Sequence, residues 1–198
     1  MATLGTNPHF SDLQPTLEHT LPQVIAHVAA RYGNTPFIVS ESGDHISFAD
    51  FKARVDRLAR ALIAHGVDHG ERVALWAPNS AEWIIAASAT ECIGAIMVPI
   101  NTRFKGGEAL YALGKTRARI LFTADHFLGN DYAAMLRQAG GGAGERGPVR
   151  ELPALTHVVA LDGSDLIRFE VAQVDDAALA ARIAAVTPDS IADILFTS

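Results

Sequence analysis

The 198-residue sequence has little cysteine, and this scarcity excludes two kinds of stabilisation. Cys92 is the only cysteine, so an intramolecular disulfide cannot form and the spaced thiols of a structural zinc site are absent. Its neighbours, Thr-Glu before it and Ile-Gly after it, lie within an apolar segment. This setting favours a small buried hydrophobic residue over a reactive nucleophile.

An excess of positive charge is also absent. Lysine and arginine number 16 against 22 aspartates and glutamates, which leaves a formal net charge of −6. Because polyanion binding relies on basic surface, we expect no nucleic-acid partner. The longest apolar run, Cys92–Ile100, is interrupted by Pro99 and falls short of the roughly 20 residues of a membrane span. The N-terminus lacks the basic and apolar regions of a signal peptide, so we expect a cytoplasmic location.

Common catalytic and metal-binding patterns are missing as well. The eight histidines form no His-Glu-x-x-His pattern of the kind that metal hydrolases use, and no Gly-x-Ser-x-Gly elbow occurs. No carboxylate pair can be argued from the sequence among Glu82, Glu91 and Glu108. We therefore assign no catalytic residue and no metal ligand.

Residues 142–147 formally match the dinucleotide-binding pattern Gly-x-Gly-x-x-Gly. That fingerprint needs a strand before it and a helix after it. Here a helical pattern precedes the glycines and Pro148 follows them. We interpret this stretch as a surface connection.

Helical and strand patterns alternate along the chain. Ser47 is a plausible N-cap with Asp50 three residues later, and the apolar stripe that follows predicts a helix closed by Gly66. Near-continuous apolar strands separated by helices pair in parallel. The fold class is therefore α/β, a mostly parallel sheet flanked by helices. Helices are predicted over 21–32, 47–66, 81–93, 107–115, 132–139 and 175–186, and strands over 37–40, 72–76, 96–100, 119–123, 156–161 and the last ten residues.

The last ten residues read Asp-Ser-Ile-Ala-Asp-Ile-Leu-Phe-Thr-Ser, an apolar strand that ends in a pair of hydroxyl side chains. Thr197 and Ser198 stand where a turn would begin. Hydroxyls and backbone N–H groups at such a turn, with glycines and a lysine, can bind phosphate. The alternative interpretation is an ordinary strand end without a binding role, because many strands finish in Thr-Ser.

The order of several short segments carries a more specific signal. Each is weak alone, and the ordered set resembles the N-terminal half of the adenylate-forming (AMP-binding) acyl-CoA synthetases. In that family Thr-Ser opens the phosphate-binding loop. The segments are Ser47–Phe51, Leu62–Gly66, Gly70–Ala74, Pro78–Ser80, Gly94–Ala95, Val98–Asn101, Glu108 with Tyr111, and Asp193–Ser198.

Within the family, four segments look most similar to actinobacterial synthetases of steroid-ring degradation, the HIP-CoA ligase type. These are Trp76–Asn79, Asn101–Arg103, Phe127–Gly129 and Asp193–Phe196. Asn79, Ser80, Asn101 and Arg103 are interpreted as cap and turn residues instead of substrate contacts.

The resemblance implies a two-step ligase reaction in the parent protein, which uses ATP, Mg²⁺ and coenzyme A on a small-molecule carboxylate such as a fatty or steroid-derived acid. It implies nucleotide contacts only at Thr197 and Ser198, an N-terminal extension over 1–20, and a partial AMP-binding domain over 21–198 that is truncated at the phosphate-loop motif. The fragment alone is expected to be inactive. A stand-alone, non-catalytic α/β binding module is the alternative, and the oligomeric state stays open.

Overall fold

The computed structural model describes residues 19–40, 43–142 and 148–196. Its described elements are α1 (Leu21–Tyr32), β1 (Pro36–Val39), β2 (His45–Ser47), α2 (Phe48–Ala64), β3 (Arg72–Trp76), α3 (Ala81–Cys92), β4 (Ile96–Pro99), α4 (Gly106–Thr116), β5 (Ile120–Thr123), α5 (Tyr132–Gly140), β6 (His157–Ala160), α6 (Ser164–Phe169) and α7 (Asp176–Ala184).

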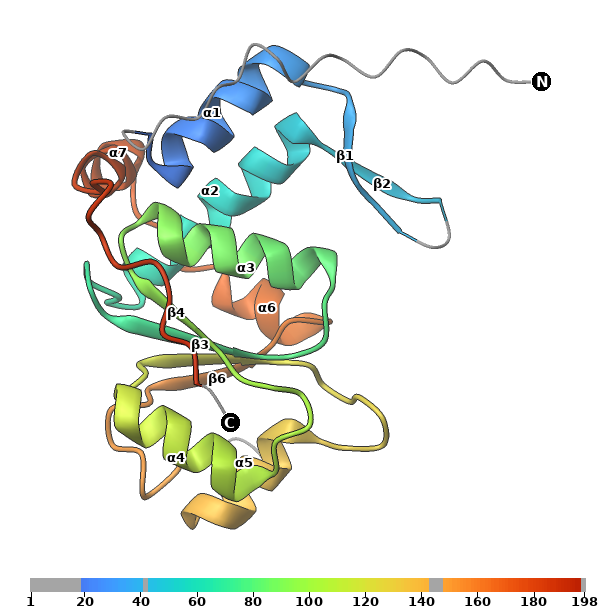
Figure 1. Ribbon diagram of the computed structural model, residues 1–198, viewed down its shortest axis with the longest axis vertical. Coiled ribbons are helices and arrows are strands. Elements are labelled where there is room, and N and C mark those ends of the chain that lie inside the picture. The colour runs from blue at the N-terminus through green and yellow to red at the C-terminus, as the bar shows by residue number, and fades with distance from the viewer. Residues whose placement is uncertain (1–18, 41–42, 143–147, 197–198) are drawn as a thin grey trace.

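A parallel sheet in the order β4-β3-β5-β6 forms the centre of the fold. Figure 1 shows α4 and α5 on one face of this sheet and α2, α3 and α6 on the other, with α1 packed outside α2 and α3. Helices on both faces bury the strands, as near-continuous apolar strands require. The predicted α/β fold with a parallel, helix-flanked sheet is confirmed.

Side-chain caps start the helices where the sequence predicts them. Ser47 Oγ accepts a hydrogen bond from Asp50 N at 3.1 Å, and Ser80 Oγ accepts one from Trp83 N at 3.1 Å. Each cap satisfies a donor that the first helical turn leaves free. The apolar stripe of α2, which includes Val55, Leu58 and Leu62, is buried against the rest of the core.

Two aromatic side chains join the sheet to the helix layer beneath it. Trp76, at the end of β3, and Tyr132, at the start of α5, are both wholly buried, and their rings stack with centroids 4.4 Å apart. Trp76 Nε1 donates to Asn101 O at 3.1 Å and Tyr132 Oη donates to Thr102 O at 3.0 Å. The two rings therefore hold the turn that follows β4.

The helices α4 and α5 approach each other closely at Gly106. A Cβ at this position would lie 2.2 Å from Met135 O on the neighbouring helix, whereas one at Gly107 would meet nothing within 4 Å. Only a residue without a side chain permits that backbone contact.

Two elements were not anticipated from the sequence. The segment β2 pairs antiparallel with β1 in a two-stranded sheet, and α6 is a helix of six residues. Both are too short for a hydrophobic period to show in the sequence. The two-stranded sheet also departs from the purely parallel pairing of the main sheet.

The predicted final strand is only partly formed. Residues 192–194 make a single parallel bridge to β4, in which Met97 N donates to Ala192 O at 2.7 Å and Ile194 N donates to Met97 O at 2.9 Å. The strand prediction was thus too long among the described residues. The physical reason lies in Pro99 of β4, which cannot donate the next ladder hydrogen bond.

Candidate functional site

The carboxyl edge of the parallel sheet is the expected place for a ligand-binding site. In open α/β sheets, ligands bind outside the carboxyl ends of the strands. The turn after β4 lies at this edge, where Asn101 Oδ1 accepts a hydrogen bond from Arg103 N at 2.9 Å. This contact supports the interpretation of Asn101 and Arg103 as turn residues.

The final segment, residues 192–196, approaches the same edge alongside β4. Its last described aromatic residue, Phe196, contacts Tyr111 of α4 with ring centroids 6.4 Å apart. Thr197 and Ser198, the predicted nucleotide contacts, lie outside the described residues. Their role in phosphate binding therefore stays a prediction.

A pair of carboxyl groups lies where this segment crosses the end of α3. The pKa of Glu91 is raised from 4.5 to about 7, mainly by burial, and the charge of Asp193 and a hydrogen bond with it act in the same direction. Glu91 is therefore partly protonated at neutral pH. Glu91 and Asp193 are far apart in the sequence, so sequence reasoning found no carboxylate pair, and only the pairing of residues 192–194 with β4 brings the two together.

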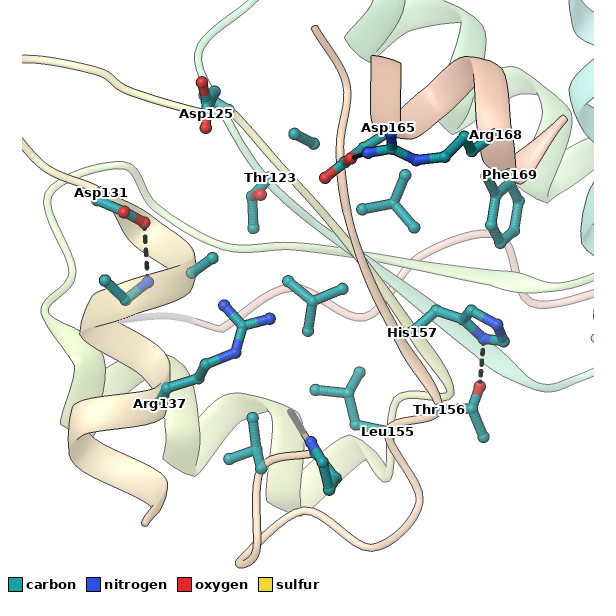
Figure 2. Close-up of a pocket in the computed structure, with 18 of the residues that line it drawn as sticks. Thr123, Asp125, Asp131, Arg137, Leu155, Thr156, His157, Asp165, Arg168 and Phe169 are labelled. Carbon is teal, nitrogen blue, oxygen red and sulfur yellow. Dashed lines mark hydrogen bonds and ion pairs between the residues drawn. The ribbon is translucent and has the colours of Figure 1, made fainter. Parts of the chain in front are cut away.

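A cavity of about 880 Å³ lies beside β6, which is the edge strand opposite β4. Figure 2 shows Arg137 of α5 reaching into it from one side and His157 and Phe169 from the other. Arg137 is almost wholly buried, while Asp165 and Arg168 form an ion pair at the rim. The lining is thus mixed, with both signs of charge and apolar walls.

Two histidines pack against one phenylalanine at the base of this cavity. The ring of His65 stacks on Phe169 with centroids 4.0 Å apart and lies edge-on to His157 at 4.6 Å. Desolvation lowers the pKa of His157, and the nearby His65 and Arg119 lower it further. His157 therefore resists protonation in the folded chain.

The lone cysteine behaves as the sequence predicts. Cys92 is buried in α3, and burial raises the pKa of its thiol to about 12, with the charge of Glu91 acting in the same direction. A thiol that stays protonated at neutral pH is a poor nucleophile.

Within residues 19–40, 43–142 and 148–196, no three histidine, cysteine or carboxylate side chains gather closely enough to hold a metal ion. None of the helices in those ranges combines the length and the apolar character needed to cross a bilayer.

Comparison with known proteins gives a consistent family. Residues 25–198 match the family described as AMP-binding enzyme. The chain is 35% identical over 195 residues to the 3-[(3aS,4S,7aS)-7a-methyl-1,5-dioxo-octahydro-1H-inden-4-yl]propanoyl:CoA ligase of Rhodococcus jostii, covering 93% of this chain and 36% of that protein. It is 37% identical over 186 residues to the ligase of the same name from Mycobacterium tuberculosis, covering 90% of this chain and 34% of that protein.

Solved structures show the same fold. The N-terminal domain of FACL13 from Mycobacterium tuberculosis superposes with a TM-score of 0.65 at 21% identity, over 91% of this chain and 42% of that chain. The chain spans about a third of the length of the curated relatives it matches. It belongs to the AMP-binding enzyme family and corresponds to the N-terminal portion of an adenylate-forming enzyme related to acyl-CoA ligases.

Proposed function

We propose that the parent protein is an ATP-dependent carboxylic acid–CoA ligase. The observation that carries this proposal is the match of residues 25–198 to the AMP-binding family, together with two acyl-CoA ligases at 35% and 37% identity. A carboxylate oxygen attacks the α-phosphorus of ATP and pyrophosphate leaves, which gives an acyl-adenylate. The coenzyme A thiol then attacks the acyl carbon, loses its proton and displaces AMP.

In that reaction, this chain would serve as a scaffold and would lead into the phosphate loop. Thr197 and Ser198 would donate hydroxyl hydrogen bonds to the ATP phosphates, where charge develops in the first step. Mg²⁺ would supply positive charge that offsets the charge of the phosphates. The described residues bring no three metal-binding side chains together, and we assign no step to the metal here.

We infer that residues 21–198 form a partial AMP-binding domain, preceded by an extension over 1–20, in a cytoplasmic protein. With two hydroxyls of the motif and neither its glycines nor its lysine, residues 1–198 alone are expected to form no acyl-adenylate. The measurement is carboxylate-dependent exchange of labelled pyrophosphate into ATP. Exchange above the no-enzyme background would refute this expectation.

The proposed substrate is a bulky, partly cyclic propanoate. Both ligases named above are named for an acid with a fused ring system on a propanoyl group. A rigid ring fills a wide pocket, whereas a straight chain loses entropy at each immobilised bond, so binding energy in the transition state favours the ring.

The ratio of kcat/KM for a ring-bearing propanoate to that for a straight-chain acid tests the substrate class. The parent enzyme is measured with ATP and coenzyme A saturating, and a ratio above one is expected. A ratio well below one would remove the ring-acid assignment and leave the acid–CoA ligase proposal standing.

The alternative, a non-catalytic α/β module, predicts a different coding sequence after Ser198. A reading frame that continues after Ser198 as Gly-Thr-Thr-Gly-x-Pro-Lys supports the ligase. A stop codon followed by unrelated sequence supports the module.

A further inference from the structure

The segment that leads to Thr197 and Ser198 is held to the sheet by few backbone hydrogen bonds. Along β4, Ile96 N donates to Glu71 O at 2.7 Å and Ile100 N donates to Leu75 O at 2.8 Å, both toward β3. Met97 N donates in the opposite direction, to Ala192 O at 2.7 Å. Even-numbered residues of β4 therefore face β3, and odd-numbered residues face the final segment.

This alternation places Pro99 at the next position that faces the final segment. A parallel ladder would continue with a donor at residue 99 and the carbonyl of Ile194 as its acceptor. Proline has no N–H. The pairing of the final segment with β4 therefore stops after the bridge at Met97, and side chains have to set the position of the residues beyond it.

Side-chain contacts also reach the final segment, and Ile194 and Phe196 pack against the core. Phe196 touches Tyr111, a residue that is itself 60% exposed. Asp193, at the bridge itself, lies against Glu91 at the end of α3. Of these contacts, the carboxyl pair is the one that protonation can change from repulsion to attraction.

The other charged or titratable groups near this pair come from α2 and from the turn before β3. On α2, Lys52 and Asp56 act on the adjacent Cys92 and are paired with each other. In the turn before β3, His69 Nε2 lies 3.5 Å from Ser190 Oγ, just before the final segment. Asp193 is the charged group that acts on Glu91 itself.

We propose that Glu91 is a positioning residue: in its protonated form it donates a hydrogen bond to Asp193, holds residues 192–196 on β4 and so sets the approach of the chain to the phosphate loop. This inference rests on the proposed ligase function, because the segment matters for ATP only in that reaction. When both carboxyls are ionised, their repulsion favours release of the segment.

The size of the effect follows from the pKa of Glu91. If release of the segment returns that pKa from about 7 to its ordinary value of 4.5, the equilibrium constant for release rises about tenfold between pH 6 and pH 8. Because Glu91 belongs to α3 and keeps part of its burial there after release, about tenfold is the upper limit and a change of severalfold is expected.

Amide hydrogen exchange of residues 1–198, followed by NMR, tests the proposal. The reporters are the amides of Met97 and Ile194, whose hydrogen bonds join the segment to β4. Their protection factors, each corrected for the intrinsic exchange rate at the same pH, should fall severalfold from pH 6 to pH 8. Protection of the Ile120 amide, in the central sheet, should stay constant.

Variants separate the carboxyl pair from a general effect of pH. Glu91→Gln keeps a donor for Asp193 without a titrating group, so the fall in protection at Ile194 should disappear. Glu82→Gln, on the first turn of the same helix, should retain the fall. Asp193→Asn should reduce it, because the charge of Asp193 contributes to the shift of Glu91.

Two results would overturn the proposal. One is a wild-type protection factor at Ile194 that does not change with pH, a result that needs no variant to fold. The other is an equal fall in Glu91→Gln. Since exchange is measured without ATP or acid, either result would leave the ligase function standing, and a failure of the ligase assays would leave the docking result standing.

Discussion

Replacing Trp76 with phenylalanine is expected to lower the free energy of unfolding by about 2 kcal/mol. Two losses add to this figure. The phenyl ring is smaller by roughly 40 Å³, which at about 24 cal/mol per Å³ of residual cavity costs about 1 kcal/mol. The hydrogen bond from Trp76 Nε1 to Asn101 O, 3.1 Å long, contributes about 1 kcal/mol more.

The variant Tyr132→Phe is the matched control for this experiment. It keeps the stacked ring, 4.4 Å from Trp76, and removes only the hydroxyl that donates to Thr102 O. Its expected cost is about 1 kcal/mol. Urea unfolding followed by far-UV circular dichroism gives both values, provided the m-value is unchanged.

A loss below about 0.5 kcal/mol for Trp76→Phe would refute the reasoning, because it would mean that neither the cavity nor the hydrogen bond matters. A loss equal to that of Tyr132→Phe would refute the cavity part alone. The double variant should cost less than the sum of the two, since both side chains hold the same turn.

Three other predictions concern stability and surface. Gly106→Ala should destabilise the chain, because its Cβ would lie 2.2 Å from a backbone carbonyl, whereas Gly107→Ala should be neutral or stabilising; equal melting temperatures would contradict the close contact. Because the pKa of His157 is lowered in the folded chain, the unfolded chain takes up the proton first as the pH falls. Stability should therefore decline below about pH 6.5, and it should decline less in His157→Gln. Parallel pH profiles of the two proteins in thermal melts would contradict this. Tyr111 and Leu195 expose 60% and 70% of their surface, so residues 1–198 should bind a hydrophobic dye, and Leu195→Ser should bind less; a compact monomer without dye binding would contradict it.

The sequence predicted the elements that have strong local signals. The helix α2 could be located because Ser47 caps it and its apolar residues recur at helical spacing, and β3 could be located because Arg72–Trp76 is a short apolar run between polar turns. Local propensity and burial agree in both elements. The parallel sheet followed from the alternation of such elements.

The missed features depend on contacts between distant residues. The segment β2 is a strand only because β1 pairs with it. The final strand was expected to be longer because its own residues are apolar, whereas its length is limited by Pro99 on a neighbouring strand. For the same reason the Glu91–Asp193 pair and the cavity along β6 could not be found from local patterns. Thr197 and Ser198 stay predictions that the described residues do not test.

The strand order β4-β3-β5-β6 has a consequence for folding during synthesis. The central strand β3 leaves the ribosome before either neighbour, and β4, β5 and β6 then follow in the order in which a docking edge becomes available to each. No strand has to be inserted between two that are already paired, so the sheet can grow outward as the chain lengthens. The free edge of β4 stays open until residues 192–194, which follow β6 in the chain, have been made. Chaperones that bind exposed strand edges during translation would therefore meet the edge of β4 during that interval.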